Sequence, residues 1–484
     1  MNLRLSILAL AGLVVLGACA DQNPAPTAPS TAATPDSPAL AAGGVGPTAI
    51  NVVLKARPTA AQLAQLGAIG AVERQYPEIN GLTLQARADQ LAAIRALPFV
   101  KGAAVDQEIM IPPPTDLVPV TDFTGGISTW DQDAIDVTVR PLSSERDVAE
   151  TGDGVYVGVL DTGLLYTWRQ YFPEERIATQ YARTFTGGGA ADRGKVVELP
   201  GDQWQHDVCA HGTHVTSTIL GYNLGGTYFQ GTAPRATVIP VRLNAEGSAN
   251  TPRSCSFYSS VAAAGLLYFA ELKQGPLAGR PLVVNNSWGS GSPDPLVQAA
   301  VDYALAHGVL LVFSAGNAGE AGMGYPGAYA PVISAAASGW TQEWTTPTWW
   351  FALDVPEPTP PDQFYITDFS SRAKAGQDLD VAAPGSWVVG PFQLQRGQPS
   401  YFFLGGTSMA APHVTGTVAL MLEKDPSLTQ AQAETTLEQT AIALGAGCRM
   451  VRPAPGAEPT QICWGTDATG AGLLDADAAV AATS

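Results

Sequence analysis

Three things are scarce in this sequence of 484 residues: basic side chains, cysteines and long apolar runs. Lys and Arg total 25 against 43 Asp and Glu, a net charge of −18, whereas a nucleic-acid binder normally carries a basic face to meet phosphates. No stretch after the N-terminal region reaches the roughly 18 uninterrupted apolar residues of a membrane-spanning helix. Five cysteines are too few for a disulfide-built miniprotein, and their odd number leaves one thiol to explain. We therefore expect no nucleic-acid partner and no transmembrane helix.

Apolar residues, in contrast, make up 46% of the chain. That share is enough to bury a large core, and it excludes wholesale disorder. The length by itself suggests roughly three domains of about 150 residues each.

Residues 1–19 are typical of an export signal. Arg4 precedes an apolar run from Leu5 to Leu16, which is too short to span a bilayer but suits a signal-peptide core. The run ends in Leu16-Gly17-Ala18-Cys19, which resembles the bacterial lipobox, so Cys19 would carry a lipid; the alternative is an ordinary signal peptide. Residues 20–47, rich in Pro, Ala and Thr, are expected to form a tether. We expect an exported bacterial protein, held in the cell envelope as a lipoprotein precursor, in a compartment where disulfides persist.

Residues 48–114 are expected to form a small α+β domain. The segments with strand patterns are Ile50–Leu54, Ala71–Tyr76, Leu82–Leu84 and Val100–Ile109, and those with helical patterns are Thr59–Leu66 and Asp89–Leu97. The order β-α-β-β-α-β predicts a small sheet backed by two helices. Pro112-Pro113-Pro114 separates this small domain from the rest of the chain.

Residues 128–484 are expected to form a large α/β domain. Its predicted strands are Val155–Leu160, Thr237–Leu243, Pro281–Val284, Val309–Phe313, Val332–Ala337 and Leu379–Ala382. Its predicted helices are His211–Leu220, Ser259–Lys273, Leu296–His307, Met409–Glu423 and Thr429–Thr440. Uniformly apolar strands that alternate with helices predict a mainly parallel sheet covered on both faces.

Three segments of this domain place a reactive side chain at a strand end or a helix start, where the active sites of α/β sheets gather. They are Val157–Gly163 with the sequence VGVLDTG, His211–Val215 with HGTHV, and Gly405–His413 with GGTSMAAPH. Each has another explanation when taken alone. The D-T-G could be a turn or half of an aspartic protease, although a second copy is absent. The H-x-x-H could bind zinc, although the H-E-x-x-H signature is missing. The G-T-S could simply cap a helix, and Pro412 would be tolerated because it falls near the first turn of that helix.

Together and in this order, the three segments resemble the catalytic blocks of the subtilisin-like serine proteases, the subtilases. Further matching blocks are Gly231–Pro234, Asn286–Gly289, Ser314–Asn317, Gly324–Gly327 and Phe369–Arg372. The resemblance covers the chain from about Ser128 onward. It implies a three-layer subtilisin-like α/β fold and a serine endopeptidase that hydrolyses peptide bonds.

The resemblance also implies the roles of the motif residues. Ser408 would attack the scissile carbonyl, His211 would act as its base, and Asp161 would orient the imidazole. The side chain of Asn317 and the backbone N–H of Ser408 would bind the oxyanion, although Asn317 could also be only a turn residue. His214 and His413 are expected to be structural.

By the same resemblance, Ser287-Trp288-Gly289 would pair with the substrate backbone, while Ala315, Gly316 and Gly324 would line the primary specificity pocket. The small residues of the pocket and the absence of an acidic one predict cleavage after bulky apolar residues. The rival to an enzyme is a catalytically silent binding protein of the same fold. Sedolisin-type peptidases are disfavoured because they use an acidic residue where His211 stands.

Two departures from the family pattern stand out. The segment after Gly163 lacks the His-Pro-Asp run that the family usually has there, which puts the common calcium site in doubt. We expect no cofactor for the chemistry, and structural calcium stays an open alternative. Residues 339–367 look inserted and hold Trp340, Trp344, Trp349 and Trp350; they form either a substrate-binding rim loop or, as we expect, a packed excursion.

The small domain resembles the subtilase propeptide, an intramolecular inhibitor whose tail, Asp106–Asp116, would lie in the cleft until self-cleavage; an unrelated domain of the same topology is the alternative. Because Cys19 lies upstream, maturation would release a monomeric enzyme from its anchor. With Cys19 acylated, four cysteines remain. We predict the disulfides Cys209–Cys255 and Cys448–Cys463, and the other two pairings stay open.

Overall fold

The computed structural model describes residues 46–111, 116–120, 128–141, 143, 145–244, 255–395 and 397–484. Contacts divide the chain into two units, Met1–Ala42 and Gly43–Ser484, and every described residue belongs to the second. The predicted signal peptide with Cys19, nearly all of the predicted tether and the 112–114 proline run lie outside the described residues. In the part that is described, no helix has the length and apolar character to cross a bilayer.

The first described part is an antiparallel sheet with strand order β2-β3-β1-β4. Its elements are β1 (Pro47–Leu54), α1 (Ala60–Gly67), β2 (Ala71–Tyr76), β3 (Gly81–Arg87), α2 (Leu91–Arg95) and β4 (Val100–Val105). A capping box between Thr59 and Gln62 starts α1. Both helices pack on one face of the sheet through Leu66, Leu91 and Ile94, as the sequence predicts. The predicted strand Val100–Ile109 is wrong as one strand, because the chain leaves this sheet after Val105.

The large sheet has the strand order β17-β16-β15-β14-β7-β12-β8-β9, with β18 paired to β16. Its strands are β7 (Tyr156–Asp161), β8 (Arg183–Gly187), β9 (Val196–Leu199), β12 (Thr237–Asn244), β14 (Leu282–Asn286), β15 (Leu310–Ser314), β16 (Ile333–Trp340), β17 (Phe364–Ile366) and β18 (Val381–Pro384). All pairs are parallel except those of β9 and β17. The six predicted strands are all confirmed, and they are parallel to one another.

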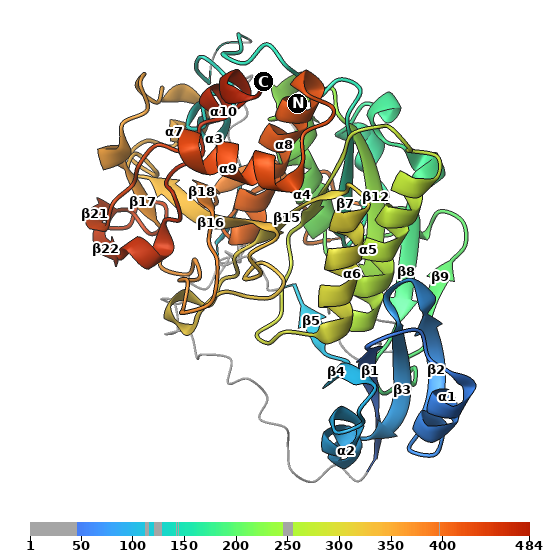
Figure 1. The fold of residues 1–484 in the computed structure, drawn as a ribbon. Coiled ribbons are helices and arrows are strands. Elements are labelled where there is room, and N and C mark those ends of the chain that lie inside the picture. Colours follow the sequence, from blue (N-terminus) through green and yellow to red (C-terminus); the bar gives the residue numbers. More distant parts are fainter. Residues whose placement is uncertain are drawn as a thin grey trace, which may run out of the picture. The chain divides into compact units, whose positions relative to one another are not determined.

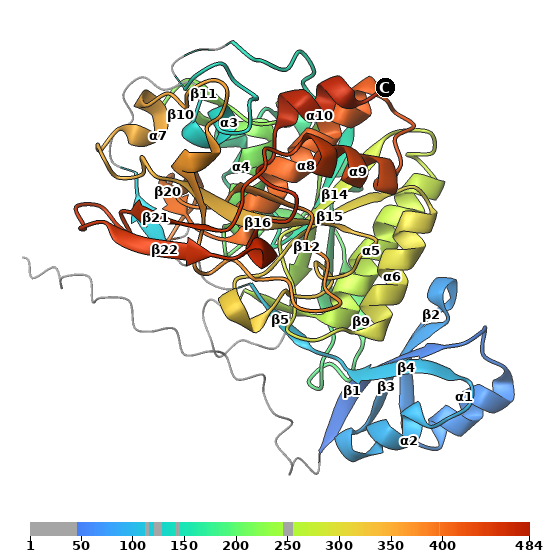
Figure 2. The same ribbon diagram turned by 60° about the vertical axis from the view of Figure 1, so that its left-hand side comes forward.

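Helices cover both faces of this sheet (Figures 1 and 2). On one face lie α4 (His211–Leu220) and α8 (Thr407–Lys424); on the other lie α5 (Ser259–Gln274) and α6 (Pro295–Ala306). Two separate apolar clusters form the two interfaces: Val159 belongs to the α4 and α8 cluster, and its neighbour Leu160 belongs to the α5 and α6 cluster. Two more helices, α9 (Gln430–Thr440) and α10 (Ala476–Ala482), pack against each other, and α10 also packs on α8. This arrangement confirms the predicted three layers.

Short strand pairs lie outside these two sheets. They are β10 (Gly221–Leu224) with β11 (Thr227–Gln230), β5 (Glu108–Met110) with β13 (Ser256–Tyr258), β19 (Val388–Pro391) with β20 (Tyr401–Leu404) and β6 (Leu117–Pro119), and β21 (Gly447–Val451) with β22 (Thr460–Trp464). The predicted Cys448–Cys463 disulfide is confirmed and joins directly opposite residues of β21 and β22.

The tryptophans of residues 339–367 are part of the core. Trp340, Trp349 and Trp350 are at most 1% exposed. The short helix α7 (Trp349–Ala352) packs on α3 (Trp130–Asp133), and the ring of Trp130 stacks against that of Trp340. The expectation of a packed excursion is therefore confirmed for these three side chains.

Candidate active site

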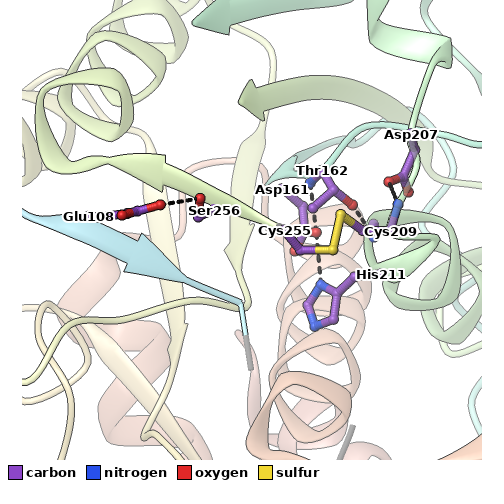
Figure 3. Close-up of a disulfide and its surroundings, with 9 residues drawn as sticks. Glu108, Asp161, Thr162, Asp207, Cys209, His211, Cys255 and Ser256 are labelled. Atoms are coloured by element: carbon purple, nitrogen blue, oxygen red, sulfur yellow. Dashed lines mark hydrogen bonds and ion pairs between the residues drawn. A yellow bond between two sulfur atoms is a disulfide. The ribbon is translucent and has the colours of Figure 1, made fainter. Parts of the chain in front are cut away.

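Asp161 ends strand β7 with its carboxylate fully buried. One oxygen, Oδ1, accepts hydrogen bonds from the backbone N–H of Thr162 at 2.7 Å and from Nδ1 of His211 at 2.8 Å. Figure 3 shows this pair next to a disulfide. The carboxylate therefore fixes which ring nitrogen of His211 carries a proton and leaves Nε2 to act as a base.

His211 is the first residue of helix α4, and Ala210 before it adopts a left-handed conformation with φ 61°. The N–H of Gly212 donates to Oγ1 of Thr162 at 2.9 Å, which ties the start of the helix to the end of β7. A Cβ on Gly212 would lie 2.4 Å from the carbonyl oxygen of Gly163, so only glycine allows this approach. The glycine of the motif thus lets the start of α4 lie against the end of β7, and this close approach brings His211 to Asp161.

The pKa of His211 is raised above its ordinary value of 6.5. Burial alone lowers it, because a charged imidazolium is costly away from water. The charge of Asp161 and its hydrogen bond to the ring outweigh burial, and the charge of Asp207 adds to them. The site therefore favours the imidazolium that forms when the base takes a proton.

Asp207 is a second buried carboxylate near this pair, and the sequence reasoning missed it. Its Oδ1 accepts the N–H of Cys209 at 2.8 Å, and burial raises its pKa to about 7. The signal for it in the sequence is a lone Asp four residues before His211, on a loop that otherwise has no carboxylate up to the helix.

His214 and His413 have structural contacts, as predicted. His214 Nε2 lies 3.2 Å from the carbonyl oxygen of Val388, and burial lowers its pKa to about 3, so this ring stays neutral. His413 bridges the carbonyl oxygen of Met409 and the carboxylate of Asp131. In the H-x-x-H pair, His211 and His214 therefore serve two unrelated partners, and the zinc interpretation has no geometric support.

Ser408 lies in the first turn of α8, close after Gly406, whose φ is 156°. The Ser408 hydroxyl donates to the carbonyl oxygen of Ser287 at 3.2 Å; among the described residues it has no hydrogen bond to His211. Helix α8 packs against α4, which carries His211. The hydroxyl is thus buried and engaged with a backbone acceptor, on a helix that packs against the helix of His211.

Pro412 is inside helix α8, past its first turn, so its expected nearness to the first turn does not explain why a proline is tolerated there. A proline there cannot donate to the carbonyl oxygen four residues earlier, which belongs to Ser408. The hydroxyl of Ser287 donates to that oxygen instead, at 2.8 Å. A side chain from another element therefore replaces the missing helical hydrogen bond.

Asn317 is held by Thr407, the residue before Ser408. Its Oδ1 accepts from the N–H of Thr407 at 2.9 Å and from the Thr407 hydroxyl at 2.8 Å. Both contacts use the oxygen, which leaves the Nδ2 group without a protein acceptor among the described residues. The role of Thr407 was missed, although it lies inside the G-T-S motif.

The residues expected to line the specificity pocket lie together. The N–H of Gly324 donates to the carbonyl oxygen of Ala315 at 2.8 Å, and a Cβ on Gly289 would lie 3.7 Å from Gly324. Gly316 has φ 104°, which favours glycine. The ring of Trp288 points into the core instead: it is 2% exposed and donates to the carbonyl oxygen of Leu160. The side chain of Trp288 is therefore not available for contact with a substrate.

The second predicted disulfide, Cys209–Cys255, is also confirmed. It joins the loop that precedes His211 to the residue that precedes β13 (Figure 3). A small cavity beside it is lined by Thr162, Asp207, Arg242 and Ser256, among others.

One group of three carboxylates among the described residues has its oxygens within 4.8 Å of one another: Asp378, Asp380 and Glu434. Burial raises the pKa of both Asp380 and Glu434 to about 7. The donor set is one that a hard cation prefers, yet Asp380 also accepts the N–H and hydroxyl of Ser334.

Comparisons with known proteins agree on one family. The profile described as the Subtilase family matches residues 152–476. Subtilisin Savinase of Lederbergia lenta is 30% identical over 330 residues, which are 68% of this chain and 91% of that protein. The extracellular serine proteinase of Thermus sp. (strain Rt41A) is 29% identical over 378 residues, which are 78% and 74% of the two chains. The match to the alkaline protease of Alkalihalobacillus alcalophilus, 30% identical, spans 65% of that protein's length and 68% of this chain.

Solved structures agree on the fold. Fervidolysin from Fervidobacterium pennivorans, a keratinolytic enzyme related to subtilisin, superposes with a TM-score of 0.59 at 23% identity, over 90% of this chain and 61% of that one. Sphericase superposes with a TM-score of 0.51 at 24% identity, over 73% of this chain and 99% of that one. The predicted subtilisin-like fold class, with its mainly parallel central sheet, is therefore confirmed.

Proposed function

The chain belongs to the Subtilase family, and from this membership and the geometry of its site we propose that it is a serine endopeptidase. Subtilases need no cofactor for catalysis, so the chemistry rests on the side chains of the site. The proposed nucleophile is Ser408, the base is His211, and Asp161 orients the base.

The reaction follows from the contacts of these residues. The Ser408 hydroxyl turns from the Ser287 carbonyl to His211 and loses its proton to Nε2 as its oxygen attacks the substrate carbonyl. Asp161, already bonded to Nδ1, stabilises the imidazolium. The free Nδ2 group of Asn317 and the N–H of Ser408 donate to the oxyanion, and His211 then returns the proton to the leaving amine.

The observation that carries this proposal is the 2.8 Å hydrogen bond between buried Asp161 and His211. A fluorophosphonate probe, which forms a covalent bond only with an activated serine, tests it. We expect the processed wild-type protein to be labelled and the Ser408→Ala variant to remain unlabelled. A wild-type protein that is folded, processed and still unlabelled would overturn the proposed enzymatic activity and favour a catalytically silent binding protein of the same fold.

We also propose that the β1–β4 domain is an inhibitory propeptide. Asp106, at its end, accepts hydrogen bonds from the N–H and hydroxyl of Ser260 at the start of α5. Asn51 of β1 donates to Asp106 and to Asp294, which caps α6. These contacts support a domain that docks on the two helix starts and covers them.

Strand β5 lies within the predicted tail and β6 follows it, and the pairing of both strands supports the course of the tail. β5 pairs with β13 on the side of the Cys209–Cys255 disulfide, and β6 pairs with β20, which leads into Ser408. We propose that self-cleavage falls between Ile111 and Leu117. N-terminal sequencing of the mature protein tests this: a start after Leu117 or before Ile111 would contradict it, and Ser408→Ala should stay full length.

The small residues Ala315, Gly316 and Gly324 support a preference for bulky apolar residues at the cleaved position. A peptide library profiled with the mature enzyme tests this preference. A profile dominated by Arg or Lys would contradict it.

Finally, we propose that an acylated Cys19 holds the precursor at the membrane and that maturation releases a soluble protease. Detergent partitioning is the test: the Ser408→Ala precursor is expected in the detergent phase and the processed wild-type domain in the aqueous phase. Release of the precursor by Cys19→Ala is the matched control, and a mature domain that stays in the detergent phase contradicts the proposal.

A further inference from the structure

Strand β13 and the tail segment after β4 form a continuous set of backbone contacts. Ile109 pairs with Phe257, the N–H of Ser259 donates to the carbonyl oxygen of Gln107 at 2.9 Å, and the N–H of Ile111 donates to the carbonyl oxygen of Cys255 at 2.8 Å. Cys255 is therefore the acceptor at the end of this ladder that lies nearest the predicted cleavage segment.

The backbone ladder of β13 has one strand on its other side, although β13 also packs against β12, β8 and α5. β13 has three residues, and within the described part of the chain its only strand partner is β5. The middle residue, Phe257, is fully buried, and its ring meets that of Trp288 edge to face. When the tail leaves, Phe257 and the packing on α5, β12 and β8 still hold the strand, and the disulfide is a covalent link at its Cys255 end.

The other end of that disulfide is two residues from the proposed base. Cys209 is followed by Ala210, in a left-handed conformation, and then by His211. The N–H of Cys209 also donates to buried Asp207 (Figure 3). The loop before His211 is therefore held by this hydrogen bond as well as by the disulfide. The disulfide and the backbone from Cys209 thus connect Cys255 covalently to His211, the first residue of α4. A displacement of Cys255 is passed along these bonds.

We propose that the Cys209–Cys255 disulfide is a positioning element that couples occupancy of the β13 strand by an extended substrate to the placement of His211. This inference rests on the proposed peptidase function and adds a covalent connection between the strand that holds remote substrate residues and the base. Binding energy from those residues then orients the reacting groups, which raises kcat more than it lowers KM.

The test compares two substrates in two variants. Cleavage of a hexapeptide that reaches β13 and of a dipeptide amide that does not is measured for wild type and for C209S/C255S. Active sites are counted by fluorophosphonate labelling. We expect the ratio of kcat/KM between the long and the short substrate to fall about tenfold or more in C209S/C255S, mainly through kcat of the long substrate.

The matched control is C448S/C463S, which removes the other disulfide from the β21–β22 pair. We expect it to lower thermal stability while the substrate ratio stays at the wild-type value. An unchanged ratio in C209S/C255S, or an equal fall in both variants, overturns the inference. Absence of labelling in wild type would instead overturn the proposed function, so the two failures are distinguishable.

If C209S/C255S does not fold, the C448S/C463S protein serves as the starting point. Its remaining disulfide is reduced after folding with a water-soluble phosphine; water supplies the oxygen of the phosphine oxide and the protons of the two released thiols, which are counted. A fall in the substrate ratio on reduction supports the coupling, and a constant ratio with two thiols released overturns it.

Discussion

Ser287 and Ser408 hold each other through two hydrogen bonds in opposite directions. The Ser287 hydroxyl donates to the carbonyl oxygen of Ser408 at 2.8 Å, and the Ser408 hydroxyl donates to the carbonyl oxygen of Ser287 at 3.2 Å. The first bond replaces the helical bond that Pro412 cannot make, and the second fixes the orientation of the Ser408 hydroxyl, the proposed nucleophile.

Replacement of Ser287 by Ala should destabilise the protein by about 1–3 kcal/mol, because it leaves the buried Ser408 carbonyl without a donor. Urea unfolding in a His211→Ala background, which prevents self-digestion, measures this cost. Thr345→Ala removes a similar hydroxyl-to-carbonyl bond at the surface and should cost less than about 0.5 kcal/mol. Equal costs for the two variants would contradict the explanation.

Asn317→Ala should lower kcat with little change in KM, because its Nδ2 group donates only to the charged oxygen of the intermediate. A loss of about 10²–10³ in kcat is the measured cost of such a donor in a subtilisin, and we expect that order here. Steady-state kinetics on a peptide amide checks it. Fluorophosphonate labelling of the variant confirms that Ser408 is still in place.

The acid limb of kcat/KM should have an apparent pKa above 6.5. His211 acts as a base only when neutral, and its pKa is raised by Asp161 and Asp207 beyond the lowering effect of burial. Activity is therefore lost as pH falls through this raised pKa. A pH profile with an acid limb at or below 6.5 would contradict the electrostatics of the site.

Asp207→Asn should move that limb toward lower pH, by at most about one unit, because it removes a carboxyl that ionises near pH 7 and whose negative charge then favours the imidazolium. Asp202→Asn is the control: this carboxylate is 62% exposed, so solvent screens its charge. Identical shifts in both variants would point to a general charge effect and not to the buried position of Asp207.

The Asp294 carboxylate should make the precursor less stable as pH rises from about 4 to about 6. Burial raises its pKa to about 6, and Asp106 nearby adds to the rise. The folded form then holds a proton that the unfolded form has lost, so the free energy of unfolding falls by about 3 kcal/mol over this range from this group. Unfolding of Ser408→Ala and of Ser408→Ala/Asp294→Asn against pH isolates it, and parallel curves would contradict the assignment.

Most elements of the fold could be predicted because their patterns are local. Buried parallel strands such as β7 and β12 are runs of apolar residues, and helix α4 begins at the residue predicted, His211. Predictions failed where a distant partner decides the structure. Val100–Ile109 is two strands because β13, far along the chain, takes up the second, and Pro412 is tolerated in the helix because Ser287 supplies a hydrogen bond.

The sequence by itself determined the family, the catalytic block order and the candidate residues Asp161, His211, Ser408 and Asn317, since these motifs are short and specific. Only the tertiary structure decided how they are supported. It places Asp207 near the Asp161–His211 pair, sets Thr407 against the oxygen of Asn317, and turns the Ser408 hydroxyl toward Ser287. The reason is physical: hydrogen bonds and charges act over a few ångströms in space, and the residues that supply them here come from separate elements of the chain.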